Sequence, residues 1–370
     1  MNNGRDLKFD IAKGIGIILM VYAHTYAYGK TFIYLFHMAF FFIIAGYFFN
    51  PKHSESFNAV KSFVKNKWVR LALPFIIFNG IYLLLNNFFI DINIYTDNPL
   101  ISSATDVTAY NAPKQYLSLS QIIPNLFKTL FLSYGTQLGG ATWFLRVLFW
   151  VSVAYCFVYY LFKKLNFNDT LFSVLNLLIC SVCLVIGGVM QHYNFNTYSI
   201  GTMFTCVALF YVGTLFRQFS NINVINNCSF ICSLIVLFVG NYYHLKVAIS
   251  TNIYPNIPVL LLLSVAGYIV IIHISAFLNN VEYINKLLVL VGQNTMPIIL
   301  MHFLAFKVVS YIQICLYGLP KFYLASFPIL YNKPYWFIFY TIAGIFIPIT
   351  LNFWMKKFFA KFLIFKKVNK

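Results

Sequence analysis

The feature that most constrains this fold is a succession of long apolar runs, because ~17–25 apolar residues cross a bilayer as one helix. About ten such runs occur in the 370 residues. A shorter apolar stretch, 122–134, predicts a short interfacial or re-entrant helix. Since lipid cannot satisfy exposed backbone groups, we expect one all-α polytopic membrane bundle over 1–370, without a separate soluble domain. The runs cover 11–28, 32–50, 71–90, 142–162, 171–190, 199–216, 227–243, 256–278, 287–312 and 335–355.

The composition and the charge pattern agree with a membrane protein. Hydrophobic residues make up 61% of the chain and charged residues 9%, whereas a soluble domain carries about 25% charged residues. The net charge of +18 does not indicate a nucleic-acid partner, because the basic residues lie mainly in short connections between apolar runs. With a cytoplasmic N-terminus, about 18 of the 26 Lys and Arg residues fall inside and about six outside. Ten spans with both termini cytoplasmic satisfy the positive-inside rule.

Two polar residues mark the ends of the first apolar run. Lys13 and His24 are separated by roughly 16 Å if the run is helical. A bilayer disfavours such residues, so they point to a function. Lys13 lies near the cytoplasmic boundary, where it can hold an anion, and Asp10 lies one helical turn before it. His24 lies deeper, where an imidazole can move a proton near neutral pH.

A second basic cluster comes just before the third run, in the segment KNKWVR at 65–70. Lys67 and Arg70 have i,i+3 spacing and share a helix face. Together with Lys13 they lie at the predicted cytoplasmic edge, where grouped cations can bind a phosphorylated ligand. The alternative is that these charges only set the topology and anchor helix ends.

Four further residues lie within or beside apolar runs. His37 starts the second run at its outer end, and His302 lies inside the ninth. Each histidine is either a neutral packing residue or a functional one. Arg146 follows Trp143 by one turn at the outer end of the fourth run; it either extends to the interface or faces the bundle and binds the acceptor. Because no histidine pair has ligand spacing and carboxylates are few, we expect no metal site.

Five segments, in the same order, resemble the acyltransferase-3 family of bacterial membrane O-acyltransferases. They are RDLKFDIAKGIGI at 5–17 followed by His24, FHMAFFFIIAGYF at 36–48, KWVRLALP at 67–74, TWFL at 142–145 and GQNTMPIILMH at 292–302. The branch that looks most similar includes fucose and polysaccharide O-acetylases. Lys13 and Lys67 stand where the family usually has arginine, which keeps the charge but loses the bidentate fork.

The resemblance implies a multi-pass enzyme of the bacterial inner membrane. It would move an acyl group, acetyl or succinyl, from cytoplasmic acyl-CoA to a hydroxyl of an envelope or exopolysaccharide glycan. Acetyl-CoA would be a co-substrate rather than a permanently bound cofactor, and glycan-synthesis proteins are candidate partners. Two alternatives remain open: a glycan exporter or lipid-linked-sugar flippase, and a catalytically inactive member of the family.

The implied mechanism distributes the candidate residues along the bundle. His24 is the expected general base, and a covalent acetyl-histidine intermediate is a variant of the same scheme. Lys13, Lys67 and Arg70 would hold donor phosphates, while Asp10 orients Lys13. His302 or a tyrosine would stabilise the oxyanion. The acceptor-side candidates are His37, Trp143 and Arg146.

Overall fold

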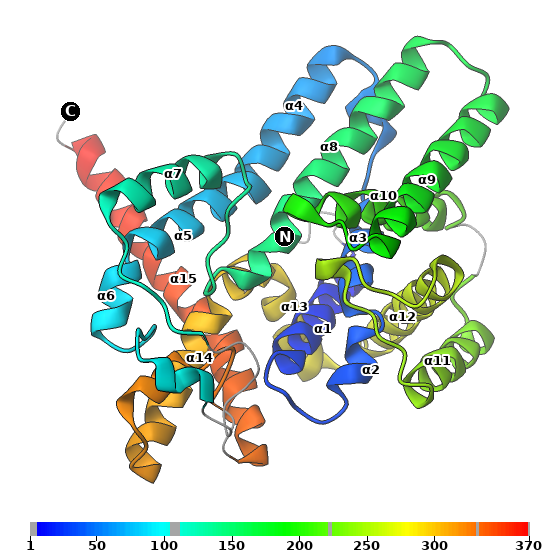
Figure 1. The fold of residues 1–370 in the computed structure, drawn as a ribbon. Coiled ribbons are helices and arrows are strands. Elements are labelled where there is room, and N and C mark those ends of the chain that lie inside the picture. The colour runs from blue at the N-terminus through cyan, green and yellow to red at the C-terminus, as the bar shows by residue number, and fades with distance from the viewer. Residues whose placement is uncertain (1–5, 104–111, 221–223, 331–332, 369–370) are drawn as a thin grey trace.

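The computed structural model describes residues 6–103, 112–220, 224–330 and 333–368, which form a bundle of α-helices (Figure 1). Arg5, the first residue of the family-like segments, lies outside the described residues. Within them, eight segments are helical, long and apolar enough to cross a membrane. They are Lys30–Tyr47, Phe57–Leu84, Gly140–Lys164, Thr170–His192, Thr197–Gln218, Ile257–Leu278, Thr295–Tyr317 and Pro334–Phe358.

Two of the ten predicted runs correspond to shorter helices, α1 (Leu7–Ala23, 17 residues) and α11 (Asn227–Tyr242, 16 residues). Every predicted run is therefore helical, which confirms the all-α polytopic bundle. The remaining helices are α2 (Lys30–Tyr34), α3 (His37–Tyr47), α4 (Phe57–Lys67), α5 (Leu73–Leu84), α6 (Asn86–Asp91), α7 (Leu119–Leu130), α8 (Trp143–Lys164), α9 (Asp169–His192), α10 (Ile200–Gln218), α12 (Ile257–Leu278), α13 (Glu282–Gln293), α14 (Thr295–Tyr317) and α15 (Phe337–Val368).

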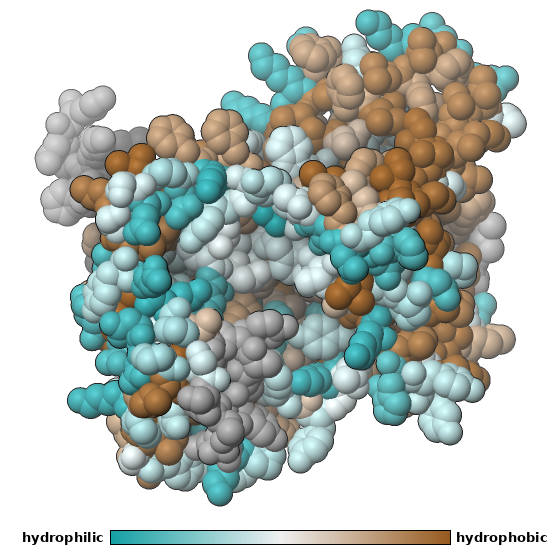
Figure 2. Space-filling view, viewed as in Figure 1, coloured by the Kyte–Doolittle hydropathy of each residue, from teal (hydrophilic) through white to brown (hydrophobic). Residues whose placement is uncertain are grey.

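The outer helices carry the apolar surface that a bilayer requires. Figure 2 shows hydrophobic side chains gathered over the arm that α8 and α9 form, with hydrophilic ones at its tip. Along α9 the exposed apolar residues recur on one side of the helix, which suits contact with lipid. They are Leu171, Val174, Leu177, Leu178, Val182, Val185 and Val189.

In contrast, α1 is enclosed by its neighbours. It packs against α3, α12, α13, α14 and α15. Ile11, Ala12, Ile17 and Val21 are fully buried. A helix that is apolar on nearly all sides is stable in such a central position. The first apolar run is thus the axis around which the candidate site is built.

The predicted single span at 287–312 is wrong in one respect, because the chain breaks there into α13 and α14. Pro297 has no N–H for the carbonyl of Gln293, and its ring clashes with that carbonyl, so a continuous helix is disfavoured. The break lets α13 pack closely on the first half of α1. A β-carbon added at Gly292 would overlap the Asp10 carbonyl oxygen. From there α14 runs toward the other end of α1.

The third predicted span begins earlier than the sequence indicated. One continuous helix runs from Phe57 to Leu84 and contains a π-turn at Trp68–Ala72. Pro74 has no N–H to donate to the carbonyl of Arg70, and the wider turn accommodates this loss. Lys67 and Arg70 consequently lie inside a helix rather than in front of it.

Glycines set the closest helix contact outside α1. A β-carbon at Gly46 of α3 would overlap the carbonyl oxygen of Phe210, and one at Gly213 of α10 would overlap that of Ile43. The two backbones therefore touch directly, as small residues allow between membrane helices.

We expect Gly213→Ala to destabilise the protein by about 1–3 kcal/mol, because the added methyl group forces α3 and α10 apart. Thermal unfolding in detergent measures this effect. Gly80→Ala is the matched control: it lies on α5, and the nearest atom to its added carbon would be 3.9 Å away. If both variants unfolded at the wild-type temperature, the close α3–α10 contact would be refuted.

Candidate functional site

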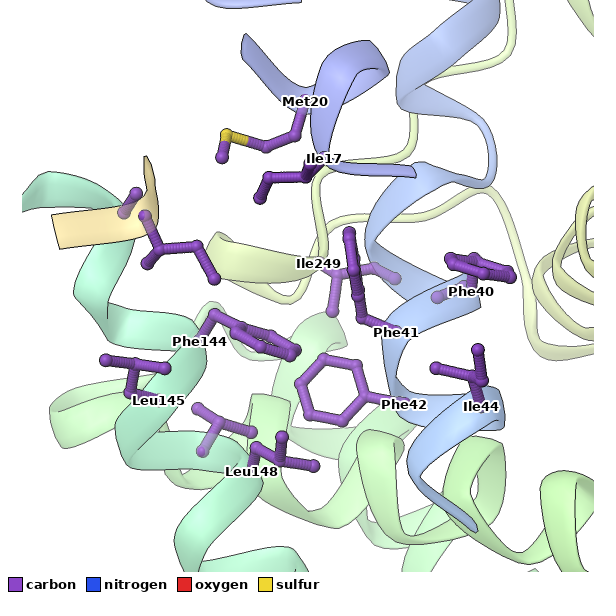
Figure 3. Close-up of a cluster of buried hydrophobic side chains, with 14 of the residues drawn as sticks. Ile17, Met20, Phe40, Phe41, Phe42, Ile44, Phe144, Leu145, Leu148 and Ile249 are labelled. Atoms are coloured by element: carbon purple, nitrogen blue, oxygen red, sulfur yellow. The ribbon is translucent and has the colours of Figure 1, made fainter. Parts of the chain in front are cut away.

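A cavity of ≈ 280 Å³ lies at the end of α1 that carries His24. Its lining includes residues from segments that the charge pattern places outside, among them 24–38, 140–144 and 247–250. The floor is apolar, and Figure 3 shows its side chains converging from α1, α3 and α8. The floor residues are Ile17, Met20, Phe41, Phe144 and Ile249.

The floor follows one face of α1. Ile17, Met20 and His24 line the cavity, and they follow Lys13 at spacings of four, seven and eleven residues. This spacing puts all four on one stripe of a helix. The cavity therefore extends from His24 along α1 on the side that leads toward Lys13.

His24 is paired with a second histidine from the far end of the sequence. Its Nδ1 lies 3.1 Å from Nε2 of His302, and the two rings are nearly parallel, with centroids 5.3 Å apart. His302 is fully buried behind the cavity wall, on α14, and its Nδ1 lies 2.8 Å from the carbonyl oxygen of Ile298. The break before α14 brings the two histidines together.

When both rings are neutral, these contacts determine which ring nitrogens carry a hydrogen. A carbonyl oxygen only accepts, so Nδ1 of His302 donates to Ile298 and Nε2 of the neutral ring is an acceptor. His24 must then donate from Nδ1 to His302. The lone pair of His24 is left on Nε2, for which the described residues supply no partner. The pair thus holds one imidazole as a proton acceptor at the cavity.

His37 gives the cavity a second imidazole. Its Nδ1 lies 2.9 Å from the carbonyl oxygen of Ile33 and must donate to it. The same reasoning leaves its lone pair on Nε2. His37 lines the cavity together with His24 and Trp143, so three of the residues selected from the sequence share one site. Arg146 is not one of them, since it lines a neighbouring hollow.

The other end of α1 carries an ion pair. Lys13 Nζ lies 2.7 Å from an Asp10 carboxylate oxygen, and the Asp10 side chain is only 2% exposed. Gln293 donates to the second oxygen of Asp10 at 3.2 Å. Asp10 can therefore position Lys13, while its distance along α1 keeps it away from His24.

The structure does not bring the remaining cations into the His24 cavity. Lys67 is partly buried, with Nζ 5.2 Å from the centroid of the Phe63 ring. Arg70 is exposed on the same long helix. Neither residue, nor Lys13, lines the cavity. Donor binding by these three residues stays a prediction.

Several residues that build the cavity were not selected from the sequence. Tyr26, Tyr34 and Phe327 line it. Asn79, a buried polar residue within an apolar run, donates to Thr142 at 3.0 Å and accepts from the backbone N–H of Thr136 at 2.8 Å. It thereby fixes the start of α8, next to the wall. A polar residue inside an apolar run was a usable signal for Asn79, whereas nothing in the sequence distinguished Tyr26, Tyr34 or Phe327.

Among the described residues, no three His, Cys, Asp or Glu side chains lie close enough together to hold a metal ion. The bundle defines a polytopic membrane protein, and its paired imidazoles lie at a cavity. The chain belongs to the acyltransferase-3 family, since the model of that family, an acyltransferase domain, matches residues 6–352. Comparisons with curated proteins and with solved structures give no significant match. The protein is therefore a membrane acyltransferase, as predicted, while its branch of the family stays a prediction.

Proposed function

We propose that this acyltransferase moves an acyl group from acyl-CoA to a hydroxyl of an envelope or exopolysaccharide glycan in the bacterial inner membrane. The observation that supports this most is the His24–His302 pair, which leaves a free imidazole nitrogen at a cavity. Such a nitrogen suits a hydroxyl nucleophile, because the hydroxyl must lose its proton as it attacks. The apolar floor of the cavity suits the uncharged thioester arm of the donor.

The proposed reaction uses His24 twice. Nε2 of His24 takes the proton of the sugar hydroxyl while the oxygen attacks the thioester carbonyl. The tetrahedral intermediate then collapses, the carbon–sulfur bond breaks, and the imidazolium returns the proton to the thiolate. The products are the glycan ester and free coenzyme A. His302 acts through His24: its lone pair accepts from Nδ1 and stabilises the imidazolium.

This arrangement changes the role proposed for His302. Its one N–H donates to Ile298 and its lone pair accepts from His24, so the neutral ring has no hydrogen for an oxyanion. We assign oxyanion stabilisation to a tyrosine hydroxyl instead. Tyr26 and Tyr34 line the cavity and are the candidates.

The donor would approach from the Lys13 end of α1. Its phosphates would bind at the cations Lys13, Lys67 and Arg70, with Asp10 orienting Lys13. The acyl-bearing arm would then lie along the stripe of Ile17 and Met20 to reach His24. This path is supported by the roughly 16 Å between Lys13 and His24 on one helix face.

Acceptor binding would use the opposite side of the cavity. His37 Nε2 can accept a second sugar hydroxyl, and Trp143 offers an aromatic face to the ring. We expect His37→Ala to raise the KM for the glycan roughly 10-fold, the effect of one lost hydrogen bond to a buried partner. Steady-state kinetics with varied glycan measure this. If the KM for acyl-CoA rose by the same factor, His37 would instead have a structural role in the fold.

The proposal is tested by incubating membranes that contain the protein with labelled acetyl-CoA and envelope glycan. Alkali-labile label on the glycan supports the acyltransferase. Donor binding without transfer would indicate an inactive family member. If neither occurs and glycan still crosses the membrane in a protein-dependent way, the protein is an exporter and the proposal fails.

A further inference from the structure

A second hollow, of ≈ 410 Å³, adjoins the His24 cavity and contains Arg146. Ser250 lines both hollows. Trp143, one helical turn before Arg146 on α8, lines the His24 cavity. A molecule that fills the cavity can therefore extend a substituent toward Arg146. We call this second space the Arg146 pocket; it is lined by Ser133, Arg146, Asn196, Tyr198, Ser199, Ser250 and Thr251.

The guanidinium of Arg146 is held by neutral groups. It donates from Nη1 to the carbonyl oxygen of Leu132 at 3.2 Å and from Nη2 to Ser199 Oγ at 2.6 Å. Its Nε is buried without a partner. The ion pairs among the described residues all join other side chains. A partly buried cation without a counter-charge is unfavourable, and it becomes favourable when an anion binds.

The rest of the Arg146 pocket suits an anion as well. Apart from Arg146, its lining residues are neutral: five carry hydroxyl groups and Asn196 carries an amide. The hydroxyls of Ser133 and Thr251 already donate to backbone carbonyl oxygens. The hydroxyls of Tyr198, Ser199 and Ser250 are the ones that can donate to a carboxylate or phosphate oxygen. Two of the five guanidinium N–H groups are used in the bonds above, so others remain for a ligand. No carboxylate of the lining competes for them.

We infer that the acceptor glycan carries an anionic group, a carboxylate or a phosphate, which Arg146 binds while a neighbouring hydroxyl reaches His24. This inference rests on the proposed function and narrows its substrate to acidic glycans. Arg146 thereby selects the acceptor and sets which hydroxyl is presented, and it takes no part in the proton transfer.

The test uses the native envelope glycan, the same glycan with its carboxyls reduced to alcohols, and the same glycan with its phosphates removed. For the wild-type protein, we expect one treatment to raise the glycan KM at least ~10-fold, and that treatment identifies the anion. Arg146→Gln should have, on native glycan, the raised KM that the wild type has on treated glycan. Its KM should be the same for native and treated glycan. Arg146→Lys keeps the positive charge but loses the bidentate geometry of the guanidinium. Its KM for native glycan should lie between those of the wild type and Arg146→Gln.

The control is Lys246→Gln, which removes an equal charge from an exposed position in the connection that also contributes Ser250. It should leave the glycan KM unchanged. If neither treatment affects the wild-type KM, or if Arg146→Gln changes the KM for native and treated glycan by the same factor, Arg146 is structural and the inference is refuted. If the wild type labels no glycan at all, the proposed function has failed, and the inference falls with it.

Discussion

Replacing His24 with alanine should reduce glycan acylation by about 10²- to 10⁴-fold, the usual contribution of a general base. The variant removes the lone pair at the cavity together with the ring contacts to His302 and Phe303. The contacts of Leu7–Ala23 stay in place, because His24 follows the last residue of α1. Label transfer from acetyl-CoA to glycan, normalised to the amount of folded protein, measures the effect.

The matched control for this prediction is His273→Ala. His273 lies on α12, stacked on Phe230 at 4.4 Å, and it does not line the His24 cavity. This variant should acylate glycan at the wild-type rate. Full activity in His24→Ala would show that another group takes the hydroxyl proton.

A second large effect is expected from His302, and it depends on the replacement. Leucine leaves Nδ1 of His24 without its acceptor, so the imidazolium loses its stabilising partner and the ring loses its orientation. We expect kcat to fall about 10- to 100-fold, with little change in the KM for either substrate. Glutamine offers a carbonyl oxygen to His24 and an amide N–H to Ile298, so His302→Gln should recover most of the lost rate.

Recovery of kcat in His302→Gln distinguishes a role of His302 in positioning His24 from a role in packing the core. A merely structural role predicts that leucine, which keeps the core apolar, is tolerated at least as well as glutamine. Gln313→Leu is the control on the same helix, since Gln313 is fully buried and donates to Tyr340 at 2.8 Å. It should affect thermal stability and leave kcat unchanged. Equal kcat values for His302→Leu and His302→Gln would contradict the positioning role.

The bundle could be predicted because lipid tolerates few kinds of structure. The apolar runs were enough to predict the fold class, whereas the topology inferred from the basic connections stays a prediction. The predicted helix boundaries differ from the structure near two prolines. Pro297 lies where one expected span is divided, and Pro74 adjoins a π-turn inside a longer helix. These effects depend on how neighbouring helices compensate for a missing N–H, which a single sequence does not state.

The sequence selected three residues that line the His24 cavity, but it did not reveal how they are assembled. A histidine at the end of an apolar run identified His24, and the same reasoning selected His37 and His302. The 3.1 Å contact between His24 and His302 comes from long-range packing, because the two residues are 278 positions apart. The contacts of His37 and His302 to backbone carbonyl oxygens are local, each to the residue four positions before. The free nitrogen on His24 follows only from that geometry. The expected cradle of Lys13, Lys67 and Arg70 depends on equally distant contacts and stays untested.

In the proposed reaction the donor enters at the Lys13 end and the acceptor at the His24 end of the same helix. Right-side-out membrane vesicles loaded with labelled acetyl-CoA, with glycan added only outside, test it most directly. We expect alkali-labile label on the external glycan with the wild-type protein and none with His24→Ala. Label that forms only when acetyl-CoA and glycan are on the same side of the membrane would contradict it.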